Sequence, residues 1–166
     1  MFIVNLSGSD LIVCFTSLLL TPMTTFMKNW YLGSAVCRLM ALTQAASICV
    51  STMTLMSIAV DRYILIVHPH RPPIVKQWAF GVIVSIWIIG ISIGIPHAYH
   101  SETTPVYGFC GEFCQERWHS MDSRAWYGFC VLAVQFAVPF AVISFCYGCV
   151  FTRVNDRWKS RRLRYQ

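Results

Sequence analysis

Charged side chains are scarce in this chain. Asp, Glu, Lys and Arg make up only 12% of its 166 residues, and just seven residues are acidic. A soluble domain usually carries about a quarter charged residues, so the scarcity argues against one. Apolar residues stand in their place: 56% of the chain is hydrophobic, 14% is aromatic, and the mean hydropathy is +0.55. The composition indicates an integral membrane protein.

The sequence also lacks the patterns on which enzymes depend. No nucleophile with a matching base, no phosphate-binding loop and no strong metal-ligand set stands out. His97, His100 and His119 lie in or beside one expected loop, without a matched partner in the sequence. We therefore expect no enzymatic activity and no bound cofactor other than a possible ion.

Four apolar stretches are long enough to cross a bilayer, which takes about 20 helical residues. No ten-residue alternation of polar and apolar side chains appears, so helices suit these stretches better than barrel strands. We expect an all-α membrane protein in a single domain, with a loop at 98–124 and a basic tail at 152–166. The expected spans are 1–27, 35–67, 78–97 and 125–151.

Basic residues predict the orientation of these spans. Nine of the thirteen Lys and Arg residues lie at the inner end of the second span or follow the second or the fourth span, and such residues favour the cytoplasmic side. Both chain ends are therefore expected in the cytoplasm and the 98–124 loop outside. This bias explains the net charge of +6 without nucleic acid, and a basic tail beside a span would touch anionic lipid. The nine are Arg62, Arg71, Lys76, Arg153, Arg157, Lys159, Arg161, Arg162 and Arg164.

Three of the eight cysteines are expected at the outer face: Cys37, Cys110 and Cys114. The compartment there is oxidising, so a disulfide between Cys37 and the 98–124 loop is expected. It would close a loop of about 75 residues and contribute roughly 4 kcal/mol. Spacing does not decide which loop cysteine is used. A weaker alternative is a zinc site formed by Cys110, Cys114 and His119.

The triplet Asp61-Arg62-Tyr63 ends the second apolar stretch, 24 residues after Cys37. At about 1.5 Å per helical residue this separation is roughly 36 Å, one bilayer crossing with a little tilt. The cysteine and the triplet are thus expected at opposite membrane faces.

Together these residues resemble the rhodopsin-like G-protein-coupled receptors. Asp61-Arg62-Tyr63, Cys37 and His68-Pro69 look like the third helix of that family. The resemblance implies that the four spans are the second to fifth of a seven-helix bundle in the plasma membrane, in a partial chain unable to signal alone. Further matching landmarks are Asn5-Leu6 with Asp10, Trp30-Tyr31-Leu32-Gly33, Trp87, and Pro139 with Tyr147.

Within that family the chain is most similar to receptors of the neuropeptide Y and neuropeptide F type. The run Cys114-Gln115-Glu116-Arg117-Trp118 resembles their C-x-E-x-W outer loop, which favours Cys114 as the partner of Cys37. Gln44 and Gln135 match their pocket glutamines. An amine receptor would carry an aspartate in place of Gln44, so the resemblance implies a neuropeptide ligand, neuropeptide Y/F-like or RF-amide-like. An alternative role for both glutamines is to hold helices together.

The resemblance also implies a switch for a heterotrimeric G protein. Arg62 would form an ion pair with Asp61 at rest and turn toward the G protein when released, with Tyr147 in support. Tyr63 completes the triplet, and Pro69 would shape the inner loop. The alternative for a lone Asp-Arg pair is ordinary snorkelling toward the headgroups.

Asp10 is an ionisable group inside a span, and it is costly there unless it faces a polar cavity. Ser51 on the next helix could share a cation or a water with it, and the resemblance makes this a sodium site. The alternative is a neutral Asp10 hydrogen-bonded between helices. Pro139 and Trp87 correspond to packing positions of the family.

Two readings outside the receptor family stay open at this stage. One is a four-span scaffold of tetraspanin type, although only Cys110-Gly111 partly fits the C-C-G motif expected there. The other is a piece of a transporter, although no internal repeat is visible. Gly90 and Gly94 form a G-x-x-x-G pattern, which we interpret as close helix packing within the bundle.

Overall fold

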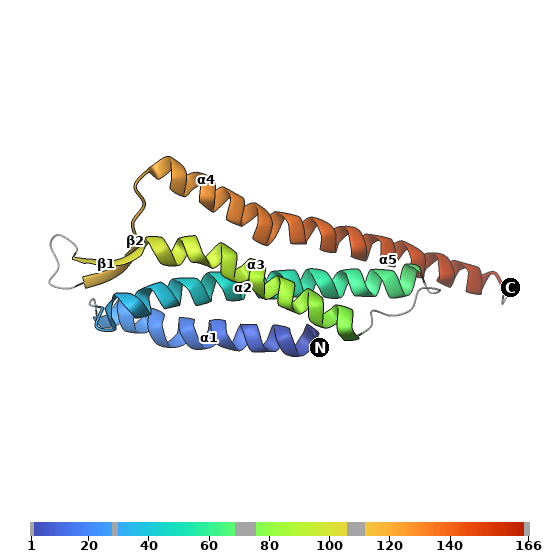
Figure 1. Ribbon diagram of the computed structural model, residues 1–166. Coiled ribbons are helices and arrows are strands. Elements are labelled where there is room, and N and C mark those ends of the chain that lie inside the picture. Colours follow the sequence, from blue (N-terminus) through green and yellow to red (C-terminus); the bar gives the residue numbers. More distant parts are fainter. Residues whose placement is uncertain (1, 28–29, 69–75, 106–111, 165–166) are drawn as a thin grey trace.

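The computed structural model describes residues 2–27, 30–68, 76–105 and 112–164. Its helices are α1 (Phe2–Met27), α2 (Gly33–Val67), α3 (Lys76–His100), α4 (Met121–Leu132) and α5 (Val138–Arg162). A π-helical turn, η1 (Ala133–Ala137), joins α4 to α5 without a break. The result is four long helical rods lying side by side (Figure 1), with α2 packed against α1, α3 and α5.

These helices cover the four apolar stretches seen in the sequence. Within the described residues, three helices are long and apolar enough to cross a membrane: Gly33–Val67, Trp78–His100 and Met121–Arg162. The part of α1 whose side chains are described without a gap, Phe2–Leu18, is apolar but shorter. The last helix continues to Arg162, so most of the expected basic tail is helical. Arg and Lys are good helix formers, and near a helix C-terminus they also complement the helix dipole.

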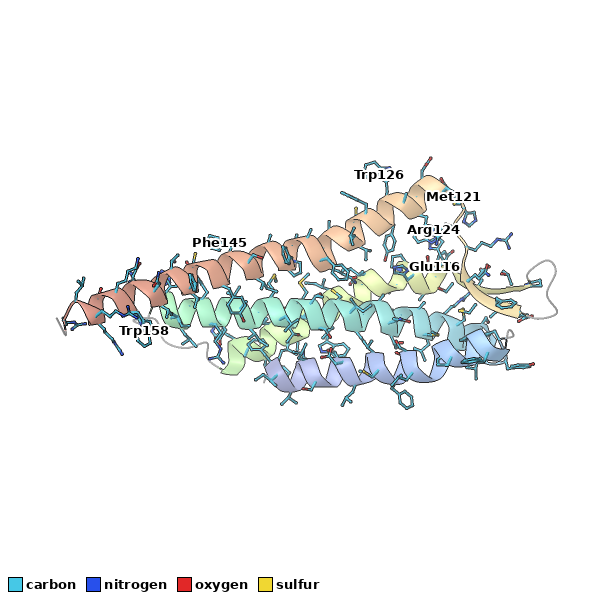
Figure 2. All side chains as sticks on the ribbon, turned by 180° about the vertical axis from the view of Figure 1, so that it is seen from behind. Glu116, Met121, Arg124, Trp126, Phe145 and Trp158 are labelled. Atoms are coloured by element: carbon cyan, nitrogen blue, oxygen red, sulfur yellow. A yellow bond between two sulfur atoms is a disulfide. The ribbon has the colours of Figure 1, made fainter. Side chains whose placement is uncertain are left out.

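Large apolar side chains cover the outside of the bundle. Phe15, Trp126, Phe140 and Phe145 are all more than 60% exposed, and Figure 2 shows Trp126 and Phe145 projecting from the long last helix. Monomeric soluble proteins rarely expose so many large apolar side chains to water. It fits helices that face lipid.

The core lies between α2 and α3, and small residues let these helices approach closely. Cys49, Val50 and Met53 of α2 pack there with Ile86 of α3. A Cβ atom added at Gly90 would lie 3.1 Å from the backbone oxygen of Ala46. The G-x-x-x-G pattern therefore serves packing inside the bundle, in agreement with the interpretation from the sequence.

A small antiparallel sheet departs from the expected all-α fold. Strands β1 (Ser101–Pro105) and β2 (Glu112–Glu116) form a hairpin in the stretch expected to be a plain loop, with Thr103 opposite Cys114. Each strand is only five residues long, which is too short to stand out in the sequence. The hairpin lies at one end of the bundle, and both described chain ends point toward the other (Figure 1). We call these the hairpin end and the basic end.

Candidate functional site: a pocket beneath a disulfide-linked hairpin

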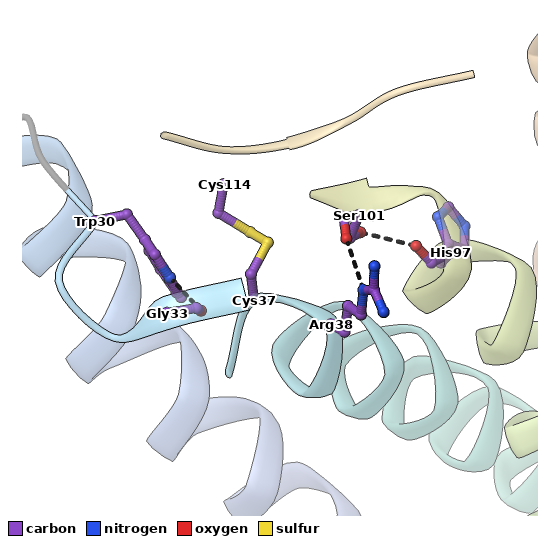
Figure 3. The surroundings of a disulfide bond; sticks show 7 residues. All are labelled: Trp30, Gly33, Cys37, Arg38, His97, Ser101 and Cys114. Carbon is purple, nitrogen blue, oxygen red and sulfur yellow. Dashed lines mark hydrogen bonds between the residues drawn. A yellow bond between two sulfur atoms is a disulfide. The ribbon is translucent and has the colours of Figure 1, made fainter. Parts of the chain in front are cut away.

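A disulfide ties the hairpin to α2. Cys37, fully buried near the start of α2, is bonded to Cys114 in β2, with 5.7 Å between their Cα atoms (Figure 3). The pairing favoured by the resemblance is thus confirmed. Because the sulfur of Cys114 is used in this bond, the zinc alternative loses a ligand. Cys110 lies outside the described residues.

Hydrogen bonds attach the hairpin at further points. The backbone N–H of Trp30 donates to the carbonyl of Glu112 at 2.7 Å, and the Trp30 indole donates to the Gly33 carbonyl, also at 2.7 Å. On α2, Arg38 Nε donates to the Ser101 carbonyl at 3.4 Å (Figure 3). The hairpin is therefore held over the first turns of α2 by covalent and polar contacts together.

A cavity of about 350 Å³ opens beneath this hairpin, and we call it the outer pocket. Its walls come from α2, α3, both strands of the hairpin, α4 and η1, so no single segment of the chain forms it. Gln44 and Gln135 both line it, as does the disulfide. The structure therefore brings together the two glutamines that the sequence placed 91 positions apart. The remaining lining residues are Met40, Ala41, Ala45, Ile48, His97, Ser101, Gln115, Glu116 and Val131.

Gln135 enters the pocket from the π-helical turn. Pro139 has no N–H to donate to the carbonyl four residues earlier, and the helix widens over Ala133–Ala137, just before it. Gln135 is buried, and its Nε2 donates to the backbone oxygen of Ala45 on α2 at 3.3 Å. This bond joins the last helix to α2. The amide keeps further donor and acceptor capacity for a ligand.

Glu116 forms the polar rim of the pocket. Oε1 of its carboxylate lies 2.6 Å from Nδ1 of His97, within hydrogen-bond distance. Oε2 accepts a hydrogen bond of 3.4 Å from the Trp118 indole. Arg124 Nε lies 3.9 Å away, and Figure 2 shows these two side chains together where the loop meets α4. The sequence showed no partner for His97, and the structure supplies one in Glu116. The fold brings the end of α3 against β2, which sequence spacing cannot show.

Aromatic rings extend this rim. His100 stacks on Trp118 with ring centroids 3.8 Å apart, and Tyr127 contacts both Trp118 and His97. The Tyr127 hydroxyl donates to the Ile93 carbonyl. Sequence reasoning missed this cluster, although the C-x-E-x-W match had already singled out one of its members, Trp118. It joins the ends of α3 and α4 to the hairpin.

Deeper in the bundle, the side chains of Asp10 and Ser51 are in direct contact. The Ser51 hydroxyl donates to Oδ1 of Asp10 at 2.7 Å and lies 2.8 Å from the buried Ser9 hydroxyl. Asp10 itself is exposed on this chain. Three oxygen-bearing side chains from α1 and α2 thus gather at one point, and oxygen ligands suit hard cations.

A second polar bridge crosses three helices and was not foreseen. Asn5 on α1 accepts a hydrogen bond from the Trp87 indole of α3 at 2.9 Å and donates to the Thr54 hydroxyl of α2 at 3.0 Å. Thr54 in turn donates to the Val50 carbonyl at 2.6 Å. Asn5 belongs to the family landmark formed by Asn5-Leu6 and Asp10, and that match was the available signal in the sequence. Trp87 thus has a polar role besides packing.

Replacing Asn5 with alanine should lower the free energy of unfolding by about 1 kcal/mol, because two interhelical hydrogen bonds averaging a little over half a kcal/mol each in membranes are lost. Thermal unfolding in detergent micelles, followed by circular dichroism, measures the change. Ser92→Ala is the control, since the exposed Ser92 hydroxyl bonds only to Ile88 of its own helix. Equal melting temperatures for the two variants would contradict a structural role for the bridge.

The basic end holds the Asp-Arg-Tyr triplet, but without the expected ion pair. Among the described residues, no ion pair includes Asp61 or Arg62. Neighbouring side chains on a helix point about 100° apart and do not face each other, which accounts for this. Arg62 is exposed and Asp61 is half-buried. The switch role of Arg62 stays a prediction.

Other contacts at the basic end join α2 to α5. The Tyr63 ring lies 6.2 Å from that of Phe145, and Arg157 donates to the Ile66 carbonyl at 3.3 Å. Tyr147 is half-exposed, so the supporting role expected of it beside Arg62 stays a prediction. Pro69 lies outside the described residues.

These features define a class: a multi-span helical membrane protein with a pocket beneath a disulfide-linked outer hairpin. Residues 1–165 match the family described as 7 transmembrane receptor (rhodopsin family), and the chain belongs to that family. It is therefore a multi-pass protein of the plasma membrane and not an enzyme. Membership also removes the tetraspanin and transporter alternatives.

The curated relatives are neuropeptide receptors. The chain is 40% identical to Neuropeptide receptor npr-1 of Caenorhabditis elegans over 162 residues, which cover 96% of this chain and 35% of that protein. It is 31% identical to the Neuropeptide F receptor of Drosophila melanogaster, covering 95% and 35%, and 31% identical to Neuropeptide Y receptor type 6 of Mus musculus, covering 98% and 48%. The chain thus spans about a third to a half of these relatives.

Proposed function

We propose that this chain forms the second to fifth helices of a receptor for a neuropeptide of the neuropeptide Y/F or RF-amide kind. The observation that carries the proposal is the outer pocket, which joins Gln44, Gln135 and Glu116 in one space. The glutamine amides would bind the peptide backbone or an amidated C-terminus, since each can donate and accept. Glu116 would add a negative charge at the rim. The names of the relatives support the ligand class.

In this proposal the hairpin end faces outside and the basic end faces the cytoplasm. The charge bias supports the orientation, and so does the disulfide, which needs an oxidising compartment. The basic end would then receive a heterotrimeric G protein. Arg62 is exposed there, where it could meet the carbonyl end of a G-protein helix.

Two further partners belong to the proposal. Asp10 and Ser51 would supply oxygen ligands to a sodium ion, and the Ser9 hydroxyl lies close enough to Ser51 to join them. When bound, the ion would offset the charge of Asp10 within the bundle. Anionic lipid would meet the basic end of α5. We propose no nucleic-acid partner.

The test uses the full-length receptor that carries this chain, with a panel of amidated neuropeptides and a G-protein nucleotide-exchange assay. At least one peptide should activate exchange. Gln44→Leu and Gln135→Leu should each weaken its binding about tenfold, the equivalent of one lost hydrogen bond at about 1.4 kcal/mol. Competition binding measures the affinity.

The control is Thr43→Val, because the Thr43 hydroxyl bonds only to carbonyls of its own helix and does not line the outer pocket. It should leave the affinity unchanged. If the glutamine variants lower the melting temperature but leave the affinity intact, both glutamines hold helices together and are not ligand contacts. Failure of every peptide would overturn the proposed ligand class.

A further inference from the structure

One carboxylate and one imidazole are in contact at the rim of the outer pocket. Nδ1 of His97 lies 2.6 Å from Oε1 of Glu116, and both residues line the pocket. Their side chains are 25% and 31% exposed, so both are partly shielded from water. Charges interact more strongly in such a place than on an open surface. Any change in the charge of one partner therefore acts on the other partner and on a ligand in the pocket.

Histidine is the side chain that ordinarily changes its charge between about pH 5 and pH 8. While the His97 ring is neutral, Nδ1 must carry its single hydrogen to donate to the carboxylate. A proton added at Nε2 makes the ring a cation, and hydrogen bonds between two ionised groups are the shorter and stronger kind. Protonation thus strengthens the contact between α3 and β2 and offsets the negative charge of Glu116.

Two groups of α4 also face the pair. Arg124 Nε lies 3.9 Å from Oε2 of Glu116, at the edge of ion-pair distance, and its side chain is 55% exposed. The Tyr127 ring meets the His97 ring edge-on with 5.1 Å between centroids, and its hydroxyl donates to the Ile93 carbonyl. Arginine and tyrosine ordinarily keep one charge state between about pH 5 and pH 8. The change in charge at the rim therefore comes from the imidazole.

Other titratable groups near the pair belong to α3, α2 and the hairpin. His100 lies in the last turn of α3, where its ring stacks on Trp118 and its Nδ1 donates to the Pro96 carbonyl at 2.9 Å. On α2, Arg38 pairs with Glu102 of β1 at 3.9 Å. None of these contacts includes the carboxylate at the pocket rim.

We propose that a proton on His97 competes with a basic peptide for Glu116, so that acidification weakens peptide binding at the outer pocket. This inference rests on the proposed function, because it needs a ligand that carries a cation. A peptide of the RF-amide kind has one in the arginine beside its amidated end. While His97 is neutral, the Glu116 carboxylate is available to the arginine of the peptide. A charged His97 holds the carboxylate and repels that arginine.

The outer pocket has room for this exchange of partners. Its volume is about 350 Å³, and Gln44 and Gln135 line the same space as Glu116. A peptide whose amidated end binds at the glutamines could thus bring its arginine to the carboxylate. Linkage makes the competition reciprocal: the factor by which a proton weakens peptide binding is the factor by which the bound peptide weakens proton binding. Peptide binding should therefore release up to one proton.

The experiment uses the full-length receptor that carries this chain and an N-acetylated peptide that ends in Arg-Phe-amide and contains no Asp, Glu, His or Lys. Such a peptide keeps its charge between about pH 5.5 and pH 7.5. Its affinity, measured by competition binding, should be weaker by about fivefold or more at the lower pH, which is within the usual size of couplings between two ligands. In His97→Gln the two affinities should agree within about twofold, because glutamine can still donate to Glu116 but takes up no proton.

His119→Gln is the matched control. His119 is exposed at the same end of the bundle, and it lines a separate cavity with Glu102, Arg117 and Trp118. Its replacement should leave the change of affinity with pH in place. Equal affinity at both pH values in the unaltered receptor would overturn the competition, as would a pH dependence that survives in His97→Gln or disappears in His119→Gln. Tighter binding at the lower pH would overturn it as well.

A measurement without peptide separates this inference from the proposed function. In the chain itself, unfolded thermally in detergent micelles, His97→Gln should lower the melting temperature more at about pH 5.5 than at about pH 7.5. The sign follows because the charged pair contributes while the ring is protonated, and this contribution is lost as the pH rises. In a Glu116→Gln background the difference should vanish. An equal loss at both pH values would overturn the proton-strengthened contact. A receptor that shows this contact but binds no peptide would instead overturn the ligand class, and the competition with it.

Discussion

Replacing Cys37 with serine should lower the free energy of unfolding by about 4.5 kcal/mol, the largest effect we expect from any single substitution. The disulfide to Cys114 joins positions separated by 77 residues. Closing a loop of that length removes chain entropy from the unfolded state, and the chain-entropy relation yields about this figure. For a chain of this size the melting temperature should fall by about 10 °C or more.

Thermal unfolding in detergent micelles, followed by circular dichroism, checks the effect. Cys130→Ser is the matched control, because Cys130 is a free and exposed cysteine of α4. It should change stability by less than about half a kcal/mol. A loss below about 1 kcal/mol in Cys37→Ser would show that the hydrogen bonds from Trp30 and Arg38 hold the hairpin in place without the disulfide.

The Cys37→Ser substitution should also disrupt the outer pocket. Cys37 and Cys114 both line it, and β2 contributes Gln115 and Glu116 to its wall. Once the hairpin is free to lift, the wall and the contact between His97 and Glu116 are lost together. In the full-length receptor we therefore expect peptide affinity to fall more than it does for either glutamine variant.

Replacing Gly94 with leucine should cost about 3 kcal/mol, the upper part of the usual range for overpacking. A Cβ atom at this position would lie 2.8 Å from Cδ1 of Leu42 and 3.0 Å from its backbone oxygen. The Leu42 side chain can turn aside, but the backbone oxygen cannot move without shifting α2. The helices would have to separate, and the packing of Val50 and Ile86 would loosen with them.

Gly81→Leu is the control for that prediction. Gly81 lies on the same helix, α3, and a Cβ atom there would meet nothing within 4 Å. Leucine should leave the stability unchanged or raise it slightly, because glycine weakens a helix by about 1 kcal/mol relative to a good helix former. Melting temperatures of the Gly94→Leu and Gly81→Leu variants, measured under the same conditions, test whether only position 94 is overpacked. Similar values would mean that α3 tolerates side chains on its α2-facing side.

Local composition and residue patterns were enough to predict the helices, the family resemblance and the disulfide partner. Long apolar runs predicted the helices because a backbone in lipid must satisfy its own hydrogen bonds, which leaves few alternatives to a helix. The spacing of Cys37, Asp61-Arg62-Tyr63, Trp87 and Pro139 was enough for the family. The C-x-E-x-W resemblance also indicated Cys114 as the disulfide partner.

Contacts between residues that lie far apart in the sequence were predicted less well. The resemblance placed Gln44 and Gln135 in a pocket, but it did not indicate the hydrogen bond from Gln135 to the Ala45 carbonyl. The sequence does not indicate the contact of His97 with Glu116 or the hydrogen bond from Trp87 to Asn5. Each of these depends on which turns of two helices lie at the same depth. That depth follows from crossing angles and loop geometry, which residue spacing does not encode.

The sequence by itself determined the class of protein and the helical stretches, because these follow from hydropathy. Motifs along the chain added a resemblance to the receptor family, and that resemblance favoured Cys114 over Cys110 as the partner of Cys37. Only the tertiary structure decided which segments line the outer pocket, which side chains meet Glu116, and that Arg62 forms no ion pair with Asp61. The physical reason is common to all three. A hydrogen bond or ion pair needs its atoms within about 3 to 4 Å, and only the packed helices set such distances.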